Sequence, residues 1–359
     1  MRSSQSKVLA ILTLVVLGSP PGLSQAADSI PAKPTQLVMN VYAGVYEACV
    51  RQTVLPRFET DSGIKLVLVT NAPPLAKLQA EGDAPEIDVM LGGAVDVLAA
   101  SNQGLLTPLT TANVRGANDI LPALQKVGYV SGKPMAIPIA FNALGLAYDA
   151  SQWQTPPTSW FDLVSPKTPG RIAVRQPDLE NTVGWLAMIA RSQNGKWPTE
   201  LSDYAPALQL VKANLRPRLA VLVQNSGAFA AAFSNEHVSL AVGMDSLTAN
   251  VAKKTGLPIQ FAVPKEGAIL TPTLAAITRT PNSYWAARLI ETMLDPAVQS
   301  QFYQCGQYRP SNAKATTTQN SNSSASASAK DASVVAVPWE KVVPVARPLG
   351  QLFLKALND

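Results

Sequence analysis

The sequence predicts an α/β fold of two doubly wound lobes that are joined by two crossing strands. Short apolar runs rich in β-branched residues alternate with helix-like segments, which is typical of parallel strands covered by helices. Apolar extended runs also follow one another without a helix between them, at residues 133–148 and again at 258–278. We interpret these two regions as an outward and a return crossing. A chain of 359 residues suits two domain-sized lobes.

The N-terminus is predicted to be a secretory signal peptide covering residues 1–26. A basic start precedes an apolar run, Val8–Leu17, which is shorter than the ~20 residues of a membrane span. Small residues at Ser24–Ala26 predict cleavage before Ala27. The alternative is a retained anchor helix, which Pro20 and Pro21 would break. No cysteine stands near the cleavage site for a lipid anchor, so we expect a free periplasmic protein.

The composition excludes several functional classes. The chain is 47% hydrophobic and 15% charged, and its net charge of +5 falls to +3 when Arg2 and Lys7 leave with the signal peptide. This charge is too small to predict nucleic-acid binding, and no Lys/Arg cluster supports it. Cys49 and Cys305 are the only cysteines, and a disulfide and two buried thiols are both open. No Cys/His spacing predicts a metal site, and no cofactor is expected.

The first lobe is predicted to contain three strands, each followed by a helix. The strands are expected at Leu37–Val41, Ile64–Thr70 and Ile87–Leu91. The first helix begins near Val45, and Pro56 is expected to restart it as a short second turn ending at Gly63. Turns such as 42–44 and 92–93 end the strands. Ligands of such sheets bind at the carboxyl ends of parallel strands.

Phe141 and Asn142 join the two apolar runs of the outward crossing. Beyond them the alternation resumes, with strands expected at 171–174, 219–223 and 238–242 and helices at 182–192, 204–214, 228–233 and up to Lys254. After the return crossing, at 258–264 and 271–278, helices are expected at 283–293 and 296–304. Residues 315–336 are rich in Ser, Thr, Asn and Ala, which predicts a mobile loop. Apolar spacing from Leu349 to Leu357 predicts a terminal helix that docks on the core.

Several segments, taken in this order, resemble one protein family. They include VYAGVYEACVRQTVLPRFETDSGIKL, APEIDVMLGGAVDVLAASNQGLLTPL, GKPMAIPIAFNALGLAYDA, HVSLAVGMDS and DPAVQSQFYQCGQYRPSNAKA. The chain resembles the extracellular solute-binding proteins of ABC transporters, in the type 2 periplasmic-binding group that includes polyamine, ferric-ion and phosphonate binders. The resemblance implies one lobe at 28–141 with 268–359 and another at 142–267, closing by hinge motion on a solute held between them.

The resemblance also implies the partners of the protein. Such a protein delivers its solute to the membrane subunits of a permease driven by an ATPase, and we expect it to be a monomer. The sequence has no phosphate-binding loop of its own.

Candidate ligand residues lie at the strand ends and at the outward crossing. Tyr42, Ala43 and Gly44 follow the first strand, Tyr46 stands one helical turn on, Asn71 ends the second strand, and Gly92 and Gly93 end the third. Tyr42 is expected to stack on a solute or donate a hydrogen bond to it, and the alternative is an aromatic packed on its own lobe. The glycines allow backbone N–H groups to approach a ligand, although tight turns also explain them. Phe141 and Asn142 are expected to form the floor of the cleft, and hinge packing is the alternative for Phe141.

Acidic residues decide which kind of solute is favoured. Asp245 falls where the polyamine binders that this chain resembles place a carboxylate for a ligand ammonium, and a helix cap is its alternative role. Asp178 and Glu180 lie in a loop where those proteins place further carboxylates. Met244 replaces an aromatic residue that they often carry. For an anionic solute, the helix start at Asn181 and Thr182 offers free N–H groups, which Glu180 would oppose.

These residues favour a binding protein for a small charged solute, with a polyamine-like amine first. A ferric-ion binder is disfavoured because Tyr303 and Tyr308 do not form an adjacent pair. Binding of an organophosphonate or phosphate ester remains an alternative, as does a sensory protein that presents its ligand to a receptor. An enzyme is not expected, because His237 is the only histidine and no G-x-S-x-G motif occurs.

Overall fold

The computed structural model describes residues 30–70, 74–109, 114–177, 180–317 and 334–358. Contacts divide the chain into a short unit, Met1–Ala32, and a large unit, Lys33–Asp359. The predicted signal peptide and most of the predicted loop at 315–336 lie outside the described residues. No helix within the described ranges is long and apolar enough to cross a membrane. All elements below belong to the large unit.

A mixed sheet organises the large unit, and its central strands run in the order β2-β1-β3-β12-β7-β10-β8-β9. These strands are β1 Gln36–Asn40, β2 Lys65–Val69, β3 Val89–Gly92, β7 Ile137–Asp149, β8 Arg171–Arg175, β9 Leu219–Val223, β10 Val238–Met244 and β12 Ala268–Thr278. Short strands extend the sheet: β4 Leu106–Thr107, β11 Ile259–Ala262, β13 Arg309–Pro310 and β14 Val334–Val335. β5 Tyr129–Val130 and β6 Lys133–Pro134 form a separate hairpin.

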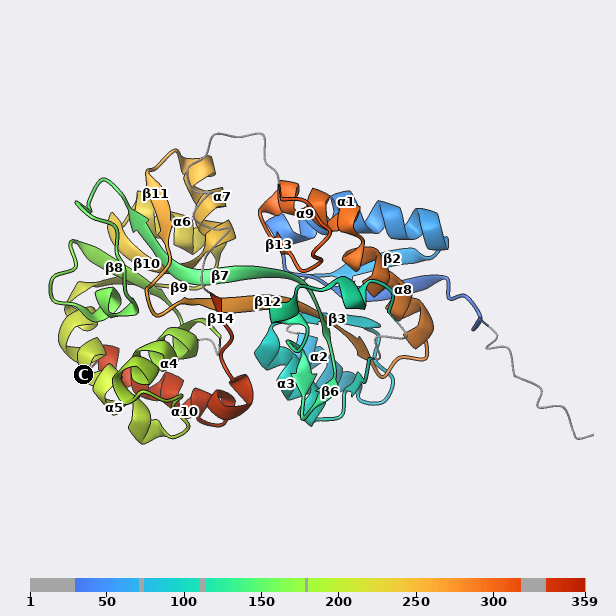
Figure 1. Ribbon diagram of the computed structural model, residues 1–359, viewed down its shortest axis with the longest axis horizontal. Helices are drawn as coiled ribbons and strands as arrows, with labels where there is room; N and C mark the ends of the chain where they lie inside the picture. The colour runs from blue at the N-terminus through green and yellow to red at the C-terminus, as the bar shows by residue number, and fades with distance from the viewer. Residues whose placement is uncertain (1–29, 71–73, 110–113, 178–179, 318–333, 359) are drawn as a thin grey trace, which may run out of the picture. The chain divides into compact units, whose positions relative to one another are not determined.

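The sheet consists of two parallel strand groups with an antiparallel pair between them. The first strand group is β2-β1-β3 and the second is β10-β8-β9, and strands pair in parallel within each group. The long strands β7 and β12 pair with each other from Leu144 and Ile269 to Ile137 and Ala275 (Figure 1). β12 also pairs with β3, and β7 with β10, both antiparallel. This arrangement confirms the two crossing strands.

The outward crossing differs from the prediction in one respect. The two apolar runs joined by Phe141 and Asn142 form a single 13-residue strand, β7, which passes through both residues without a break. Pairing with β12 and with β13 keeps this part of the chain extended, although the register with β12 shifts between Thr273 and Leu274.

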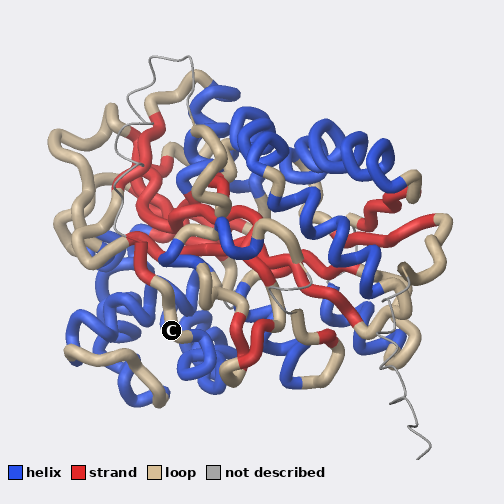
Figure 2. The backbone as a smooth tube through the Cα atoms, turned by 45° about the vertical axis from the view of Figure 1, so that its right-hand side comes forward, coloured by secondary structure: helices blue, strands red, loops and turns tan. Residues whose placement is uncertain are grey.

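Helices cover both faces of the sheet (Figure 2). They are α1 Val45–Ser62, α2 Pro74–Glu81, α3 Ala94–Asn102, α4 Asn181–Asn194, α5 Ala205–Leu210, α6 Ser226–Ser234, α7 Asp245–Thr255, α8 Ser283–Leu294, α9 Pro296–Gly306 and α10 Trp339–Asn358. In β1, Val38 belongs to one apolar core, while Leu37 and Met39 belong to another. Because neighbouring strand residues point to opposite faces, both faces are buried, as a doubly wound sheet requires. The predicted α/β fold class is confirmed.

The prediction that Pro56 restarts the first helix is wrong. α1 continues through Pro56 to Ser62 and is capped by Gly63, which adopts the left-handed conformation with φ of 64°. Val50, Val54 and Phe58 bury one continuous face on both sides of the proline. Packing of this face offsets the hydrogen bond that the proline cannot donate. The predicted helix at 204–214 is also interrupted, since α5 passes into a π-helical turn at Val211–Leu215.

Two long-range links hold the C-terminal part of the chain. Cys49 in α1 and Cys305 in α9 form a disulfide with Cα atoms 5.7 Å apart, which answers the question that their number left open. The predicted docking of the terminal helix is confirmed: α10 buries Leu349 and Phe353, and the Phe353 and Trp185 rings lie 5.9 Å apart. α10 packs against α4 and α5 as well as α3 (Figure 1). The lobe boundaries derived from the sequence stay a prediction.

Candidate functional site

Strands of both groups end where the predicted site residues lie. β1 and β3 end next to the starts of α1 and α3, while β8 and β10 end near the starts of α4 and α7. Helix starts expose backbone N–H groups and the positive end of the helix dipole. The candidate site is therefore built from strand ends and helix starts of both groups.

Tyr42, Ala43 and Gly44 form an exposed turn between β1 and α1. Gly44 has φ of 88°, and a Cβ there would meet nothing within 4 Å, so backbone conformation rather than space requires glycine. Tyr42 keeps 42% of its surface exposed. Its surroundings nevertheless raise the pKa of its hydroxyl well above the ordinary value, first through burial and then through the charges of Glu180 and Asp96. A ring that is 42% exposed beside two carboxylates suits a ligand contact.

Tyr46 occupies a buried position in an aromatic row that leads away from Tyr42. The centre of its ring lies 5.4 Å from that of Tyr42 and 4.9 Å from those of Tyr308 and Phe302, and all three pairs are T-shaped. Burial, followed by the interaction with Tyr308, raises the pKa of Tyr46, and its buried hydroxyl has no hydrogen-bond partner among the described residues. Tyr46 is 3% exposed, so its role is to pack beneath Tyr42. Direct contact with a solute would need this packing to open.

Glu180 reaches from the second strand group to the start of α3 in the first. Its Oε1 accepts a hydrogen bond of 3.1 Å from the backbone N–H of Val95. A Cβ on Gly93 would collide with the Glu180 carboxylate, so the absence of a side chain at 93 permits this approach. Asp96 accepts a second bond of 3.1 Å from the N–H of Gly93. We call Tyr42, Glu180 and Asp96 together the carboxylate cluster.

Asp245 has a strong partner that the sequence did not predict. Its Oδ1 accepts backbone N–H bonds from Ala143 at 3.1 Å and Ser246 at 2.9 Å. Its Oδ2 accepts from Nε of Arg309 at 2.7 Å, and Nη2 of Arg309 lies 2.7 Å from the same oxygen. The side chains of Asp245 and Arg309 are only 11% and 13% exposed. We call Asp245 and Arg309 the ion-pair cluster.

Burial dominates the electrostatics of the ion-pair cluster. Desolvation raises the pKa of Asp245, although Arg309 and the two backbone N–H groups oppose the shift. Burial also raises the pKa of Tyr303 nearby, where Arg309 lowers it and Asp245 adds to the rise. Asp245 is the first residue of α7, and its Oδ1 accepts the backbone N–H of the second residue of that helix, Ser246, at 2.9 Å. This bond supports the alternative role of Asp245 at the helix start, while its other partners, Ala143 and Arg309, lie outside α7.

Phe141 and Asn142 lie beside the ion-pair cluster on β7. The Arg309 guanidinium lies 5.8 Å from the centre of the Phe141 ring, within the range of a cation–π interaction. Asn142 is 5% exposed, and its Oδ1 has no hydrogen-bond partner among the described residues. A buried acceptor without a donor costs free energy, which an N–H donor on a solute would recover.

The other predicted residues hold the structure together or lie outside it. Thr182 is fully buried and donates to the backbone oxygens of Arg175 and Gln176, and Asn181 is 7% exposed as the first residue of α4. Met244 ends β10 opposite Leu144, and Gly92 is buried opposite Leu274 of β12. Asn71 and Asp178 lie outside the described residues.

Sequence reasoning missed Asp96 and Arg309. Asp96 stands three residues after Gly93, the spacing of a residue that bonds back to the start of its helix, so a local signal existed. Arg309 lies 64 residues from Asp245 and reaches it because β13 pairs with β7 at Phe141. No local sequence pattern predicts the contact between Asp245 and Arg309.

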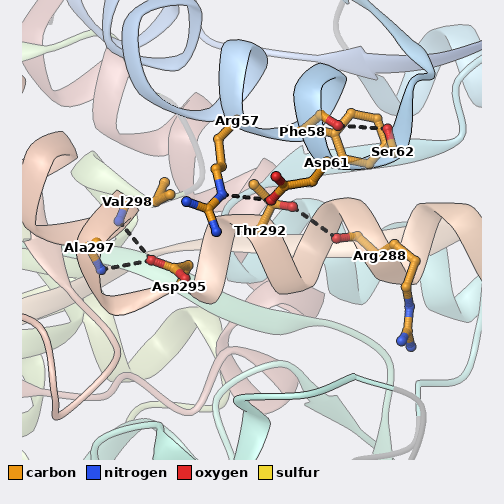
Figure 3. A network of polar contacts seen from close by, with 9 residues as sticks. All are labelled: Arg57, Phe58, Asp61, Ser62, Arg288, Thr292, Asp295, Ala297 and Val298. Atoms are coloured by element: carbon orange, nitrogen blue, oxygen red, sulfur yellow. Dashed lines mark hydrogen bonds and ion pairs between the residues drawn. The ribbon is translucent and has the colours of Figure 1, made fainter.

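A cavity of about 400 Å³ opens elsewhere, between α1, α8 and α9. Its charged side chains are bound to nearby groups: Arg57 pairs with Asp61 at 2.6 Å, and Asp295 accepts two backbone N–H bonds at the start of α9 (Figure 3). Glu291 pairs with both Arg115 and Arg288. This internal pairing leaves the cavity less suited to a charged solute than the strand-end site. No group of three or more metal-binding side chains occurs in the parts of the chain that are described.

The fold and the strand-end site define a class of protein that binds a small solute between two α/β lobes. The sequence pattern of the bacterial extracellular solute-binding proteins matches residues 54–330, and the chain belongs to this family. The spermidine/putrescine-binding periplasmic protein 1 of Haemophilus influenzae is 26% identical over 280 residues, covering 77% of this chain and 76% of that protein. The spermidine/putrescine-binding periplasmic protein of Escherichia coli is 26% identical over 268 residues, covering 73% and 74%.

Solved structures share the fold. An ABC transporter substrate-binding protein from Bradyrhizobium japonicum matches with a TM-score of 0.73 at 21% identity, over 90% of this chain and 100% of that chain. A spermidine/putrescine ABC transporter substrate-binding protein from Streptococcus pneumoniae matches with a TM-score of 0.69 at 17% identity, over the same shares.

Proposed function

We propose that this protein is the periplasmic substrate-binding component of an ABC importer that captures a small amine of the polyamine type and delivers it to a membrane permease. Family membership supports the binding role, and the spermidine/putrescine-binding relatives support the amine. The periplasmic location rests on the signal peptide predicted at residues 1–26. A role in binding rather than catalysis agrees with the names of these relatives.

The carboxylate cluster is the observation that carries the choice of an amine. Glu180 and Asp96 come from opposite strand groups, and the charges of both raise the pKa of the Tyr42 hydroxyl. Carboxylates that converge beside an aromatic hydroxyl are suitable acceptors for an ammonium group, since charge-assisted hydrogen bonds are about twice as strong as neutral ones. The buried Oδ1 of Asn142 offers a further acceptor.

A thermal-shift panel tests the class of solute. We expect putrescine, spermidine or a related alkylamine to raise the melting temperature of the purified protein, because a ligand that binds only the folded state stabilises it. Ferric ion, an organophosphonate and a phosphate ester form the other arms of the panel. Stabilisation by one of these, with no amine effective, would replace the amine assignment.

Glu180→Gln tests the carboxylate cluster directly. The variant keeps an acceptor for the Val95 N–H but removes the charge, so amine affinity should fall by about tenfold or more, measured by calorimetric titration. Glu236→Gln is the matched control, because Glu236 forms a half-exposed ion pair with Arg171 on the surface. Equal affinities for both variants and the unmodified protein would remove Glu180 from the site.

A further inference from the structure

We infer that the guanidinium of Arg309 occupies the place beside Asp245 that a ligand ammonium would otherwise take, and we call it the resident cation. The solute of this site therefore carries one ammonium group rather than two. The inference rests on the proposed function and narrows its solute from a diamine to an alkylamine or amino acid with one cationic end. It depends on which hydrogen-bond acceptors of the site are already used.

Both carboxylate oxygens of Asp245 are occupied within the protein. Oδ1 accepts two backbone N–H bonds, from Ala143 and Ser246, while Oδ2 accepts a hydrogen bond from Nε of Arg309 and lies 2.7 Å from Nη2 of the same guanidinium. An ammonium group has three N–H donors and needs acceptors for them. For Asp245 to accept an ammonium, the guanidinium would have to leave a pair that is almost fully buried.

Arg309 is held in this position from several sides. Its backbone belongs to β13, which pairs with β7 opposite Phe141, and its guanidinium lies over the Phe141 ring. The disulfide at Cys305 fixes the end of α9 four residues earlier, and Tyr308 packs against Tyr46 and Phe302. These contacts place the cation beside Asp245 without help from a ligand.

The resident cation changes the charge that a second ammonium would meet. Asp245 and Arg309 together are neutral, while Arg309 would repel a further positive charge brought beside it. A diamine with one end at the carboxylate cluster gains little from a second ammonium near this pair. The buried guanidinium Nη2 has no hydrogen-bond partner of adequate geometry among the described residues, so a neutral or carboxylate end of the solute is tolerated better than a cationic one.

The test compares three four-carbon solutes by calorimetric titration: putrescine, butylamine and 4-aminobutyrate. The unmodified protein should bind at least one of the two solutes with a single ammonium about tenfold or more tightly than putrescine. Arg309→Gln removes the resident charge, and the freed Asp245 should raise putrescine affinity by about tenfold without an equal gain for butylamine. The double variant D245N/R309Q should lose that gain, because it removes the carboxylate as well.

Two controls separate charge from damage to the fold. Arg309→Lys retains a cation and should retain the preference for one ammonium. Arg279→Gln removes an exposed arginine that pairs with Asp83, and it should leave all three affinities unchanged. The ranking of solutes by the unmodified protein tests the inference even if Arg309→Gln does not fold.

The outcomes distinguish this inference from the proposed function. Tighter binding of putrescine than of both single-ammonium solutes by the unmodified protein would overturn the inference and leave the amine function standing. The inference is also overturned if the folded Arg309→Gln variant keeps the original preference. If only Arg309→Gln binds putrescine and the unmodified protein binds no amine, the proposed amine function fails and the single-ammonium solute is overturned with it. If neither protein binds any amine, both are overturned.

Discussion

The carboxylate cluster and the ion-pair cluster use the same acidic chemistry in opposite ways. Glu180 and Asp96 accept backbone N–H bonds at the start of α3 and act on a partly exposed tyrosine. Asp245 accepts backbone N–H bonds as well, but its second oxygen is bound to a guanidinium and its side chain is almost buried. A carboxylate near a binding site therefore says little about the charge of the ligand until its own partners are known.

The two clusters also differ in how they join the strand groups. Glu180 crosses between the groups through a long, flexible side chain that bonds one backbone N–H. Asp245 is fixed to β7 by Ala143 and to β13 by Arg309, so it connects α7 to the crossing strand. The first contact is therefore the weaker link, a single hydrogen bond of 3.1 Å, while the second combines backbone hydrogen bonds with a nearly buried ion pair.

The largest expected difference between the clusters is in stability. Asp245→Asn should lower the free energy of unfolding by about 3 kcal/mol or more, because it leaves a nearly buried guanidinium without its counter-charge. Glu180→Gln should cost about 1 kcal/mol, since the amide oxygen still accepts from Val95. Urea unfolding of both variants measures the difference.

The double variant D245N/R309Q provides the control for this comparison. Burial raises the pKa of Asp245, which means that the folded protein disfavours the ionised carboxylate despite its partners. Removing both charges should therefore recover most of the stability that Asp245→Asn loses, to within about 1 kcal/mol of the unmodified protein. If the double variant were less stable than either single variant, the two charges would not be acting as a pair.

A smaller effect is expected from Gly93→Ala at the carboxylate cluster. The new Cβ would occupy the place of the Glu180 carboxylate, which is the end of a flexible side chain and has to move away from α3. We expect a loss of about 1 kcal/mol in unfolding free energy and a several-fold loss of amine affinity. In a Glu180→Ala background the same change should cost almost nothing. An equal cost in both backgrounds would mean that Gly93 serves the turn and not the carboxylate.

The fold was largely predictable because its signals are local. Strand–helix alternation predicted both strand groups, and paired apolar runs without an intervening helix predicted the crossings. The error at Pro56 arose because tertiary packing of Val50, Val54 and Phe58 maintains a helix that the proline alone would end.

The site was predictable only in part. Strand ends predicted Tyr42 and Gly93, and the resemblance to polyamine binders predicted Glu180; the structure brings the three residues together. The partner of Asp245 depends on the pairing of β13 with β7, a contact between distant segments, and no periodicity or spacing in one sequence encodes it. Whether the named residues bind a solute stays a prediction.

The smallest expected effect concerns the pH dependence of the carboxylate cluster. Because the pKa of Tyr42 is raised, its hydroxyl remains neutral as the pH rises from 7 to 9. Amine affinity measured by calorimetry should therefore stay level over this range, and Tyr42→Phe should show the same level profile. The variant should bind amines less tightly by a factor below about ten, the scale of one neutral hydrogen bond.

An affinity that rises with pH in the unmodified protein but not in Tyr42→Phe would contradict this prediction. Such a rise would require an ionised tyrosine beside Glu180 and Asp96, since a phenolate attracts an ammonium more strongly than a hydroxyl does. The two carboxylates would then lie too far from Tyr42 to raise its pKa. A level profile in both proteins keeps Tyr42 as a neutral donor or stacking ring and leaves the charge of the solute to Glu180 and Asp96.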